Sequence, residues 1–406
     1  MGSMSQAPPR VLRGRVVTPT AVVDDGVVAY AGDRITWVGT AASAPGELRE
    51  AVAAAPRTDG YVLPGLVDLH CHGGGGASIP DAEDADTVRT AVAEHLRHGT
   101  TSLVASLVTA PPDVLRARTA VLADLAEAGE IAGIHFEGPF ISAERCGAQN
   151  PAAIQEPDTA LTRELLELSR GHAVTMTLAP EARGVTGPDG VSRALVTGGA
   201  LPSFGHTVAD AEQARAAVAE AGRWLAEETA ARSTRPTVTH LCNGMNPMHH
   251  REPGPIPEFL AAARDGRLVL ELIADGVHLA PSFVRNVFEL VGRENVVLVT
   301  DAMAAAGMAD GAYQLGSLAV TVTDGVARLT HGGAIAGGTA HLLDVVRTTV
   351  AGGVDLVDAV YAAATGPAVV LGDDTVGALE TGRRADVLVT DNELRPVEVV
   401  RNGVSV

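Results

Sequence analysis

Two histidines one residue apart, His70 and His72, stand at the end of an apolar run that begins near Tyr61. Because alternate side chains of a strand share a face, both imidazoles are expected to point the same way, with Cys71 packing on the other face. Neutral imidazole is a common zinc ligand, and the four glycines at 73–76 allow backbone to pass close to an ion. We therefore predict that this pair binds a metal, with two surface histidines as the alternative.

Three other apolar runs each end on one residue of a metal-binding type. Glu137 stands against Gly138-Pro139, where a carboxylate is costly unless it is paired or bound to a metal. His206 and His240 end two further runs; taken alone, each is more often a core or surface histidine than a ligand. One acid and two imidazoles from three strands match the three protein ligands of an open catalytic zinc site, whose fourth position holds an activated water.

More polar residues follow strand-like runs. Asp301 closes the run 297–300 and is interpreted as a metal ligand or as the general base that moves a proton to a leaving amine, with a strand-end cap as the structural alternative. His278 is expected to donate to a substrate carbonyl. In the loop 243–254, Arg251 can hold an oxyanion with two parallel hydrogen bonds. His135 is interpreted as a hydrogen-bonded histidine of the interior.

The elements that carry these residues alternate between strand-like and helix-like segments. Helical spacing is seen at 84–98, 113–127 and 161–169, each after a short apolar run. This alternation predicts parallel strands joined by right-handed crossovers, and about eight units suggest a closed (β/α)8 TIM-like barrel of the α/β class. An open doubly wound sheet is the alternative, but no Gly-x-Gly-x-x-Gly follows a first strand. The predicted strands are 61–70, 102–107, 131–136, 174–178, 203–205, 237–241, 268–273 and 296–299.

Both ends of the chain contain short β-rich runs separated by turn signals such as Asp24-Asp25-Gly26. We therefore predict one small β-sandwich domain formed by both termini, at 10–62 and 368–406, beside a barrel at 63–367. Active sites of such barrels lie at the carboxyl ends of the strands, where the polar residues above fall.

Composition excludes several classes of function. The chain has 406 residues and a net charge of −19, which disfavours a nucleic-acid partner. It contains no lysine, so Schiff-base chemistry and a carboxylated lysine between two metals are excluded. Three widely spaced cysteines make no disulfide framework. No long apolar run and no signal core at 1–9 are present, so a cytoplasmic protein with no membrane partner is expected.

Taken together, the motifs resemble a known family. The segment Pro64-Gly65-Leu66-Val67-Asp68-Leu69-His70-Cys71-His72-Gly73-Gly74 resembles the first-strand motif of the amidohydrolase superfamily. The remaining segments are similar to the set that marks N-acetylglucosamine-6-phosphate deacetylases, and the resemblance covers 11–403, with the loop 240–254 as its most specific piece. Those segments are 133–140, 205–207, 239–254, 274–278, 300–302 and 335–338.

The resemblance implies a role for each of these residues. Glu137, His206 and His240 would hold a divalent metal, usually zinc, and Asp301 would shuttle the proton. His278 would lie against the N-acetyl carbonyl or the sugar. The implied contacts to the amino-sugar phosphate come from Asn243, Gly244 and Arg251, from the loop residues Ala148 and Gln149, and from the backbone of Ile335, Ala336 and Gly337.

The chain also departs from the family pattern. Family members often have histidine where Gln149 stands, and some lack a complete His-x-His and use one metal. Because His70 and His72 are both present, one or two ions are expected, the second bridged by Glu137. The family also implies a homodimer in which Arg251 reaches the neighbour's site.

Two rival functions are weighed beside this one. Another amidohydrolase reaction, such as a cyclic-amide hydrolase or an N-acyl-D-amino-acid deacylase, would keep the metal ligands and lack the phosphate loop. A catalytically inactive binding protein on the same fold would be expected to have lost ligands, whereas every expected ligand position is filled here.

Overall fold

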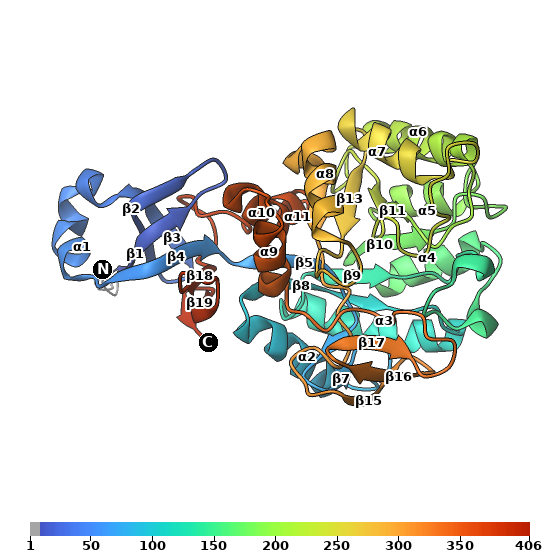
Figure 1. Cartoon of the computed structure of the whole chain (residues 1–406), viewed down its shortest axis with the longest axis horizontal. Helices are drawn as coiled ribbons and strands as arrows, with labels where there is room; N and C mark the ends of the chain where they lie inside the picture. The colour runs from blue at the N-terminus through green and yellow to red at the C-terminus, as the bar shows by residue number, and fades with distance from the viewer. Residues whose placement is uncertain (1–8) are drawn as a thin grey trace, which may run out of the picture.

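The computed structural model describes residues 9–406 as a barrel and a smaller β domain (Figure 1). The smaller domain contains one seven-stranded sheet, in the order β20-β19-β18-β4-β1-β2-β3. Its central strand β4 runs parallel to β1 and antiparallel to β18, so segments from both ends of the chain meet across it. The strands are β1 (Arg10–Val17), β2 (Val22–Ala31), β3 (Arg34–Thr40), β4 (Arg57–Pro64), β18 (Val387–Thr390), β19 (Pro396–Arg401) and β20 (Val404–Ser405).

This sheet fits the small β-sandwich domain predicted from the two termini. Helix α1 (Arg49–Ala54) packs over one face, where Val52 joins Val27 and Ala29 in a buried cluster. The exact domain boundaries stay a prediction. The signal-peptide argument rests largely on residues 1–8, which lie outside the described part of the chain.

The larger part is a sheet of eight parallel strands that follow the order of the chain, which confirms the predicted TIM-like barrel. All six residues of β5 and all eight of β8 are buried, as expected for strands that pack on both faces. The strands are β5 (Leu66–Cys71), β8 (Thr100–Leu107), β9 (Gly133–Phe136), β10 (Ala173–Leu178), β11 (Leu201–Phe204), β12 (Thr237–Val238), β13 (Val269–Leu272) and β14 (Val296–Leu298).

The barrel closes between its last and first strands just beyond the end of β14. The Asp301 amide donates to the His70 carbonyl at 2.9 Å, and the His72 amide donates to the Ala302 carbonyl at 2.7 Å. The hydroxyl of Thr300 adds a 2.6 Å hydrogen bond to the carboxylate of Asp68. Residues 300–302 therefore continue the pairing of the eighth strand beyond β14, next to the site.

Helices surround the barrel, and several begin at a sequence-encoded cap. The Asp84 and Asp158 carboxylates accept first-turn amides of α2 and α4, and Asp210 forms a capping box with Gln213 at α6. The helices are α2 (Ala85–Arg97), α3 (Pro112–Glu127), α4 (Thr159–Leu168), α5 (Val191–Thr197), α6 (Ala211–Glu227), α7 (Ile256–Arg264), α8 (Pro281–Val291), α9 (Leu342–Ala351), α10 (Leu356–Ala363) and α11 (Thr365–Leu371). No helix of the described chain is long and apolar enough to cross a bilayer.

Two predicted strands are wrong in their extent, since the one predicted at 237–241 ends at Val238 and the one predicted at 61–70 is divided. The run 61–70 was expected to be continuous, but the structure divides it into β4 and β5 at Gly65, where the chain leaves the small domain for the barrel. The Gly65 amide donates to Asp386, whereas the Leu66 amide donates to Gly99. A Cβ at position 65 would lie 2.2 Å from the Thr101 hydroxyl, so only glycine fits this crossing.

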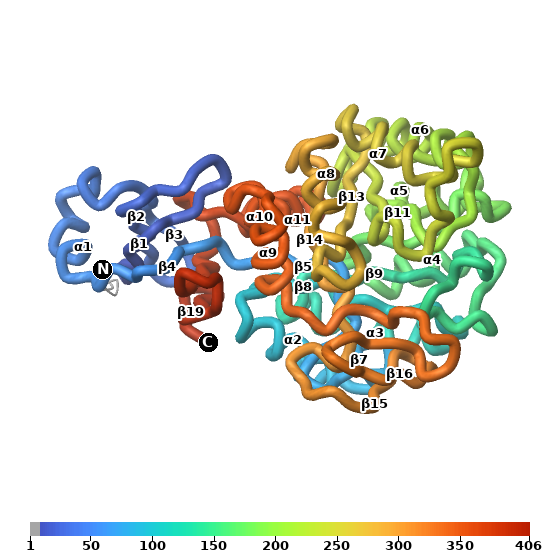
Figure 2. The backbone as a smooth tube through the Cα atoms, in the orientation of Figure 1, coloured from blue at the N-terminus to red at the C-terminus, as the bar shows by residue number. Residues whose placement is uncertain are grey.

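Two short sheets were not predicted. The antiparallel strands β15 (Gly311–Leu315), β16 (Leu318–Thr323) and β17 (Val326–Leu329) form a separate sheet after β14, and β6 (Gly73–Gly74) pairs with β7 (Ala77–Ser78). In the tube trace the chain passes from β15 to β16 and then returns to α9 (Figure 2).

Candidate active site

The carboxylate of Glu137 stands between two groups of histidines at the end of β9. Its Oε1 lies 2.8 Å from Nε2 of His206 and 2.9 Å from Nε2 of His240. Its Oε2 lies 3.1 Å from Nε2 of His72 and 3.8 Å from Nε2 of His70. Each oxygen of one carboxylate therefore faces a different pair of imidazoles.

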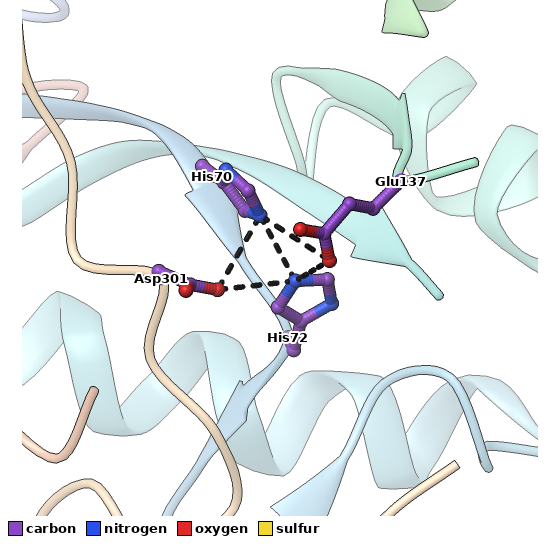
Figure 3. A group of neighbouring side chains, drawn as sticks. All are labelled: His70, His72, Glu137 and Asp301. Atoms are coloured by element: carbon purple, nitrogen blue, oxygen red, sulfur yellow. Dashed lines mark hydrogen bonds and ion pairs between the residues drawn. The ribbon is translucent and has the colours of Figure 1, made fainter. Parts of the chain in front are cut away.

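Asp301 completes the second group (Figure 3). Its Oδ1 lies 3.2 Å from Nε2 of His72 and 3.4 Å from Nε2 of His70. The five ligands predicted from the sequence and Asp301 are thus brought together in two groups that share Glu137. The first metal group is Glu137, His206 and His240, and the second metal group is His70, His72, Glu137 and Asp301.

These donor sets fit divalent metal ions. Nε2 of His70 and His72 approach to 2.9 Å, and Nε2 of His206 and His240 to 3.1 Å. All four ring nitrogens also converge on carboxylate oxygens. Imidazole nitrogen and carboxylate oxygen are the ligands of catalytic zinc sites, so these donor atoms fit a cation held between them.

The outer ring nitrogens are held so that Nε2 faces the centre. Nδ1 of His206 donates to the Arg145 carbonyl at 2.8 Å, and Nδ1 of His72 donates to the Ser106 carbonyl at 3.2 Å. Nδ1 of His70 lies 3.2 Å from the carboxylate of Glu271. Such outer partners fix the tautomer and the ring orientation of a metal ligand.

Glu271 is a site residue that sequence reasoning missed. It is fully buried on β13, where Oε2 also accepts the His240 amide at 3.3 Å. The available signal was a single acid inside the apolar run 268–273, a position where a carboxylate needs a specific partner.

The charges of the site are strongly coupled. Burial lowers the pKa of His70, but the nearby carboxylates of Asp301, Glu137 and Glu271 outweigh it and hold that pKa well above its ordinary value. Burial raises the pKa of Glu137, but hydrogen bonds from four histidines hold it well below its usual range. Burial also raises the pKa of Asp301, but His70 and His72 outweigh it and hold that pKa below its ordinary value. The carboxylates are therefore ionised, ready to bind a cation.

Three of these residues occupy backbone conformations that side chains rarely adopt. The φ angles of His206, His240 and Asp301 are +46°, +28° and +46°. Such strain persists only where the surroundings enforce it, and it is concentrated at functional sites. All three residues lie just beyond the end of a barrel strand, where the ligand side chains converge.

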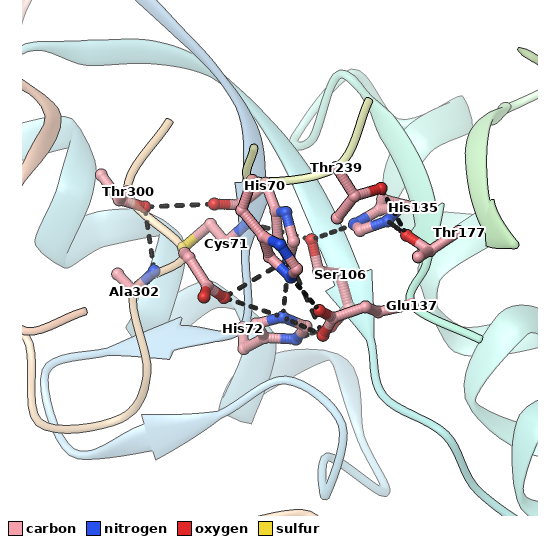
Figure 4. A network of polar contacts seen from close by, with 12 residues as sticks. His70, Cys71, His72, Ser106, His135, Glu137, Thr177, Thr239, Thr300 and Ala302 are labelled. Carbon is pink, nitrogen blue, oxygen red and sulfur yellow. Dashed lines mark hydrogen bonds and ion pairs between the residues drawn. The ribbon is translucent and has the colours of Figure 1, made fainter. Parts of the chain in front are cut away.

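A buried polar chain lies beside the metal ligands (Figure 4). The Ser106 hydroxyl accepts from the Cys71 amide and lies 3.0 Å from Nδ1 of His135, whose Nε2 lies 3.0 Å from the Thr177 hydroxyl. Burial holds the pKa of His135 well below its ordinary value, so it stays neutral. The interpretation of His135 as a satisfied interior histidine is confirmed by these contacts.

A cavity of about 230 Å³ opens above the metal ligands. His278 borders it, and Nδ1 of this histidine lies 2.8 Å from the Asp275 carboxylate. Burial lowers the pKa of His278, but Asp275 outweighs it and raises the pKa above its ordinary value. The predicted contact residues that line the cavity are Ala148, Gln149, Asn243, Gly244, His278, Ile335 and Gly337.

Two predicted contact residues lie elsewhere. Ala336 is fully buried beside the cavity rather than in its lining. Arg251 is exposed on the loop after Asn246, where it borders a separate surface groove of about 640 Å³. One copy of the chain therefore does not bring Arg251 to its own cavity.

Position 244 in the cavity wall requires glycine. A Cβ at this position would lie 2.7 Å from Nδ1 of His206, and the residue has a φ of +59°. Its carbonyl accepts the Thr207 amide at 2.9 Å. Glycine thus lets the loop after β12 pass directly behind a metal ligand.

The barrel, the paired histidines and the shared carboxylate define a hydrolase of the metal-dependent amidohydrolase type, and the comparisons agree. The model of the amidohydrolase family matches residues 61–406, and the chain belongs to this family. Within it, the chain is similar to deacetylases of N-acetylated amino-sugar phosphates.

Curated relatives from distant organisms support this similarity. The chain is 35% identical over 326 residues to N-acetylglucosamine-6-phosphate deacetylase of Bacillus subtilis (strain 168), covering 78% of this chain and 76% of the relative. It is 33% identical over 359 residues to N-acetylgalactosamine-6-phosphate deacetylase of Escherichia coli O157:H7, covering 87% and 89%.

A solved structure is similar over nearly the whole chain. A variant of N-acetyl-D-glucosamine-6-phosphate deacetylase from Mycobacterium smegmatis, in complex with N-acetyl-D-glucosamine-6-phosphate, superimposes with a TM-score of 0.87 at 38% identity. This match covers 98% of this chain and 99% of that one.

Proposed function

We propose that the chain hydrolyses the acetamide of N-acetylglucosamine 6-phosphate to glucosamine 6-phosphate and acetate. The observation that carries the proposal is the cavity in which Asp301, His278 and two metal-ligand groups face one space. The similarity to amino-sugar phosphate deacetylases supplies the substrate class.

The metal is proposed to be zinc. Glu137, His206 and His240 would hold one ion, and His70, His72, Asp301 and the second oxygen of Glu137 would hold another. When bound, such an ion polarises the acetamide carbonyl and makes a nearby water more acidic.

Asp301 is proposed as the general base and acid. Its carboxylate borders the cavity, and its lowered pKa keeps it ionised at neutral pH. It takes the proton of the attacking water while the oxygen adds to the acetamide carbon. It then gives this proton to the amine nitrogen as the carbon–nitrogen bond breaks.

His278 is proposed to stabilise the charge that develops on the carbonyl oxygen. Asp275 holds Nδ1 and raises the pKa of the ring, which favours the protonated imidazole, whose Nε2–H would donate to the carbonyl oxygen.

The sugar phosphate is proposed to bind between two copies of the chain. Asn243 and Gly244 border one cavity, and Arg251 would arrive from a partner in a homodimer. Arg251 is exposed on the loop 243–254, where its guanidinium would hold the phosphate. The expected location of the enzyme is the cytoplasm.

Acetate release by the purified protein tests this proposal. N-acetylglucosamine 6-phosphate, unphosphorylated N-acetylglucosamine and N-acetylgalactosamine 6-phosphate are compared, before and after chelation. We expect chelator-sensitive release that requires the phosphate. The galactose epimer is included because the E. coli relative is named for it. Equal release from the unphosphorylated sugar would favour a different amide substrate.

A further inference from the structure

Gln149 contacts the metal-ligand carboxylate, and its orientation is fixed by a group that can only donate. The backbone N–H of Thr109 lies 2.7 Å from one terminal atom of the Gln149 side chain, so this atom is the carbonyl Oε1. The amide Nε2 is therefore turned to the opposite side, where it donates to Oε2 of Glu137 at 2.5 Å. Gln149 is 3% exposed, so these bonds are largely shielded from water.

The oxygen that Gln149 contacts is the one that faces the second metal group. Oε2 of Glu137 lies 3.1 Å from His72, whereas Oε1 lies against His206 and His240. The terminal torsion of a glutamate has a broad energy minimum, so a carboxylate without a fixed partner rotates readily. The Gln149 amide occupies one acceptor site of Oε2 and leaves the other for a cation.

Thr109 contacts both Gln149 and Glu137. Its amide orients Gln149, and its hydroxyl donates to the Glu137 carbonyl at 3.0 Å. One residue just after β8 therefore fixes the backbone of Glu137 and, through Gln149, its side chain.

We propose that Gln149 is a positioning residue that holds Glu137 as a bridge between two metal ions, rather than a contact for the sugar. The inference rests on the proposed metal centre. It implies that the chain binds two ions per subunit, and that the second ion, beside His70 and His72, depends on the amide of Gln149.

The test compares Gln149→Met with a matched variant of the next residue, Asn150→Ala. Methionine keeps the length and approximate volume of the side chain but donates no hydrogen bond. Asn150 belongs to the same loop, where it donates to the Ser317 hydroxyl at 2.9 Å and accepts the Ala152 amide. The Asn150 side chain thus contacts Ser317 and Ala152 rather than Glu137, so its loss loosens the loop without removing the contact to the carboxylate.

Metal stoichiometry and the affinity of each equivalent are measured by elemental analysis and zinc titration of the purified, chelator-stripped proteins. We expect two equivalents in the wild type and in Asn150→Ala. In Gln149→Met the second equivalent should bind about 10–100-fold more weakly, the usual effect of losing an outer-shell partner, while the first is retained. Thermal melting of each apoprotein confirms that the variants are folded.

Each other outcome is informative. Two equivalents of unchanged or higher affinity in Gln149→Met would overturn the inference, as would equal losses in both variants or a single equivalent in the wild type. A wild-type protein that binds one ion and still releases acetate would leave the proposed function standing. A wild-type protein that binds no metal would refute the metal centre itself.

Discussion

Replacing Asp301 by asparagine removes the proposed proton acceptor while preserving its shape. Asparagine adopts the left-handed backbone more readily than most residues, so the φ of +46° at this position is tolerated. The backbone amide also keeps its 2.9 Å bond to the His70 carbonyl, which closes the barrel. The variant is therefore expected to fold.

The size of the effect follows from what the carboxylate does in the structure. Loss of a general base lowers kcat by about 10²–10⁴-fold, or roughly 3–5 kcal/mol of activation free energy. Asp301 does not contact His206 or His240 in the first metal group, which keeps all its ligands. The second group loses one carboxylate, so its ion should bind more weakly.

Steady-state acetate release and elemental analysis on the same samples separate the loss of the general base from the weaker binding of the second ion. Asp324→Asn is the matched control, because Asp324 also has a positive φ, +52°, but lies exposed in the turn between β16 and β17. We expect the control to behave as wild type. Near-normal turnover in Asp301→Asn would refute the assignment, and loss of the first metal equivalent would mean that the substitution disturbs the site as a whole.

Three further outcomes are expected. Glu271→Gln removes the negative partner of Nδ1 of His70, so metal affinity should fall about 10–100-fold; an unchanged zinc titration would contradict this. Asp275→Asn should lower the pKa of His278, because Asp275 raises it, and so move the alkaline limb of the kcat/KM profile to lower pH; an unmoved limb would exclude His278 as the required cation. Chelation should abolish turnover and lower the melting temperature, since a ligand of the folded state stabilises it, and added zinc should restore both; activity that survives full metal depletion would refute the metal mechanism.

The location of the site could be predicted because each ligand is recognisable from the residues next to it in the sequence. Each ligand ends an apolar run, and parallel strands that follow the chain order bring their carboxyl ends to one mouth. The strand ends at Glu137, His206 and His240 therefore indicated a common site before any contact was known. The cost of a buried acid gave the same indication at Glu137.

The features that sequence reasoning missed depend on contacts between distant segments. Glu271 and the run that contains it look like an ordinary buried strand until Nδ1 of His70 is placed beside it, 201 residues away in sequence. The division of 61–70 into two strands depends on Asp386, which pairs with the Gly65 amide across domains. The orientation of Gln149 depends on the Thr109 amide, 40 residues earlier.

The contacts that close the barrel also position the second metal group. The regular pairing of β14 ends at Leu298, and the seam to β5 is completed by residues 300–302. The Asp68 carboxylate is buried there and accepts the Thr300 hydroxyl as well as the His70 and Thr300 amides. These contacts set the two strand ends in register, which places Asp301 against His70 and His72. A change that loosens the seam should therefore weaken the second metal group before the first, because Glu137, His206 and His240 come from strands on the continuous part of the barrel.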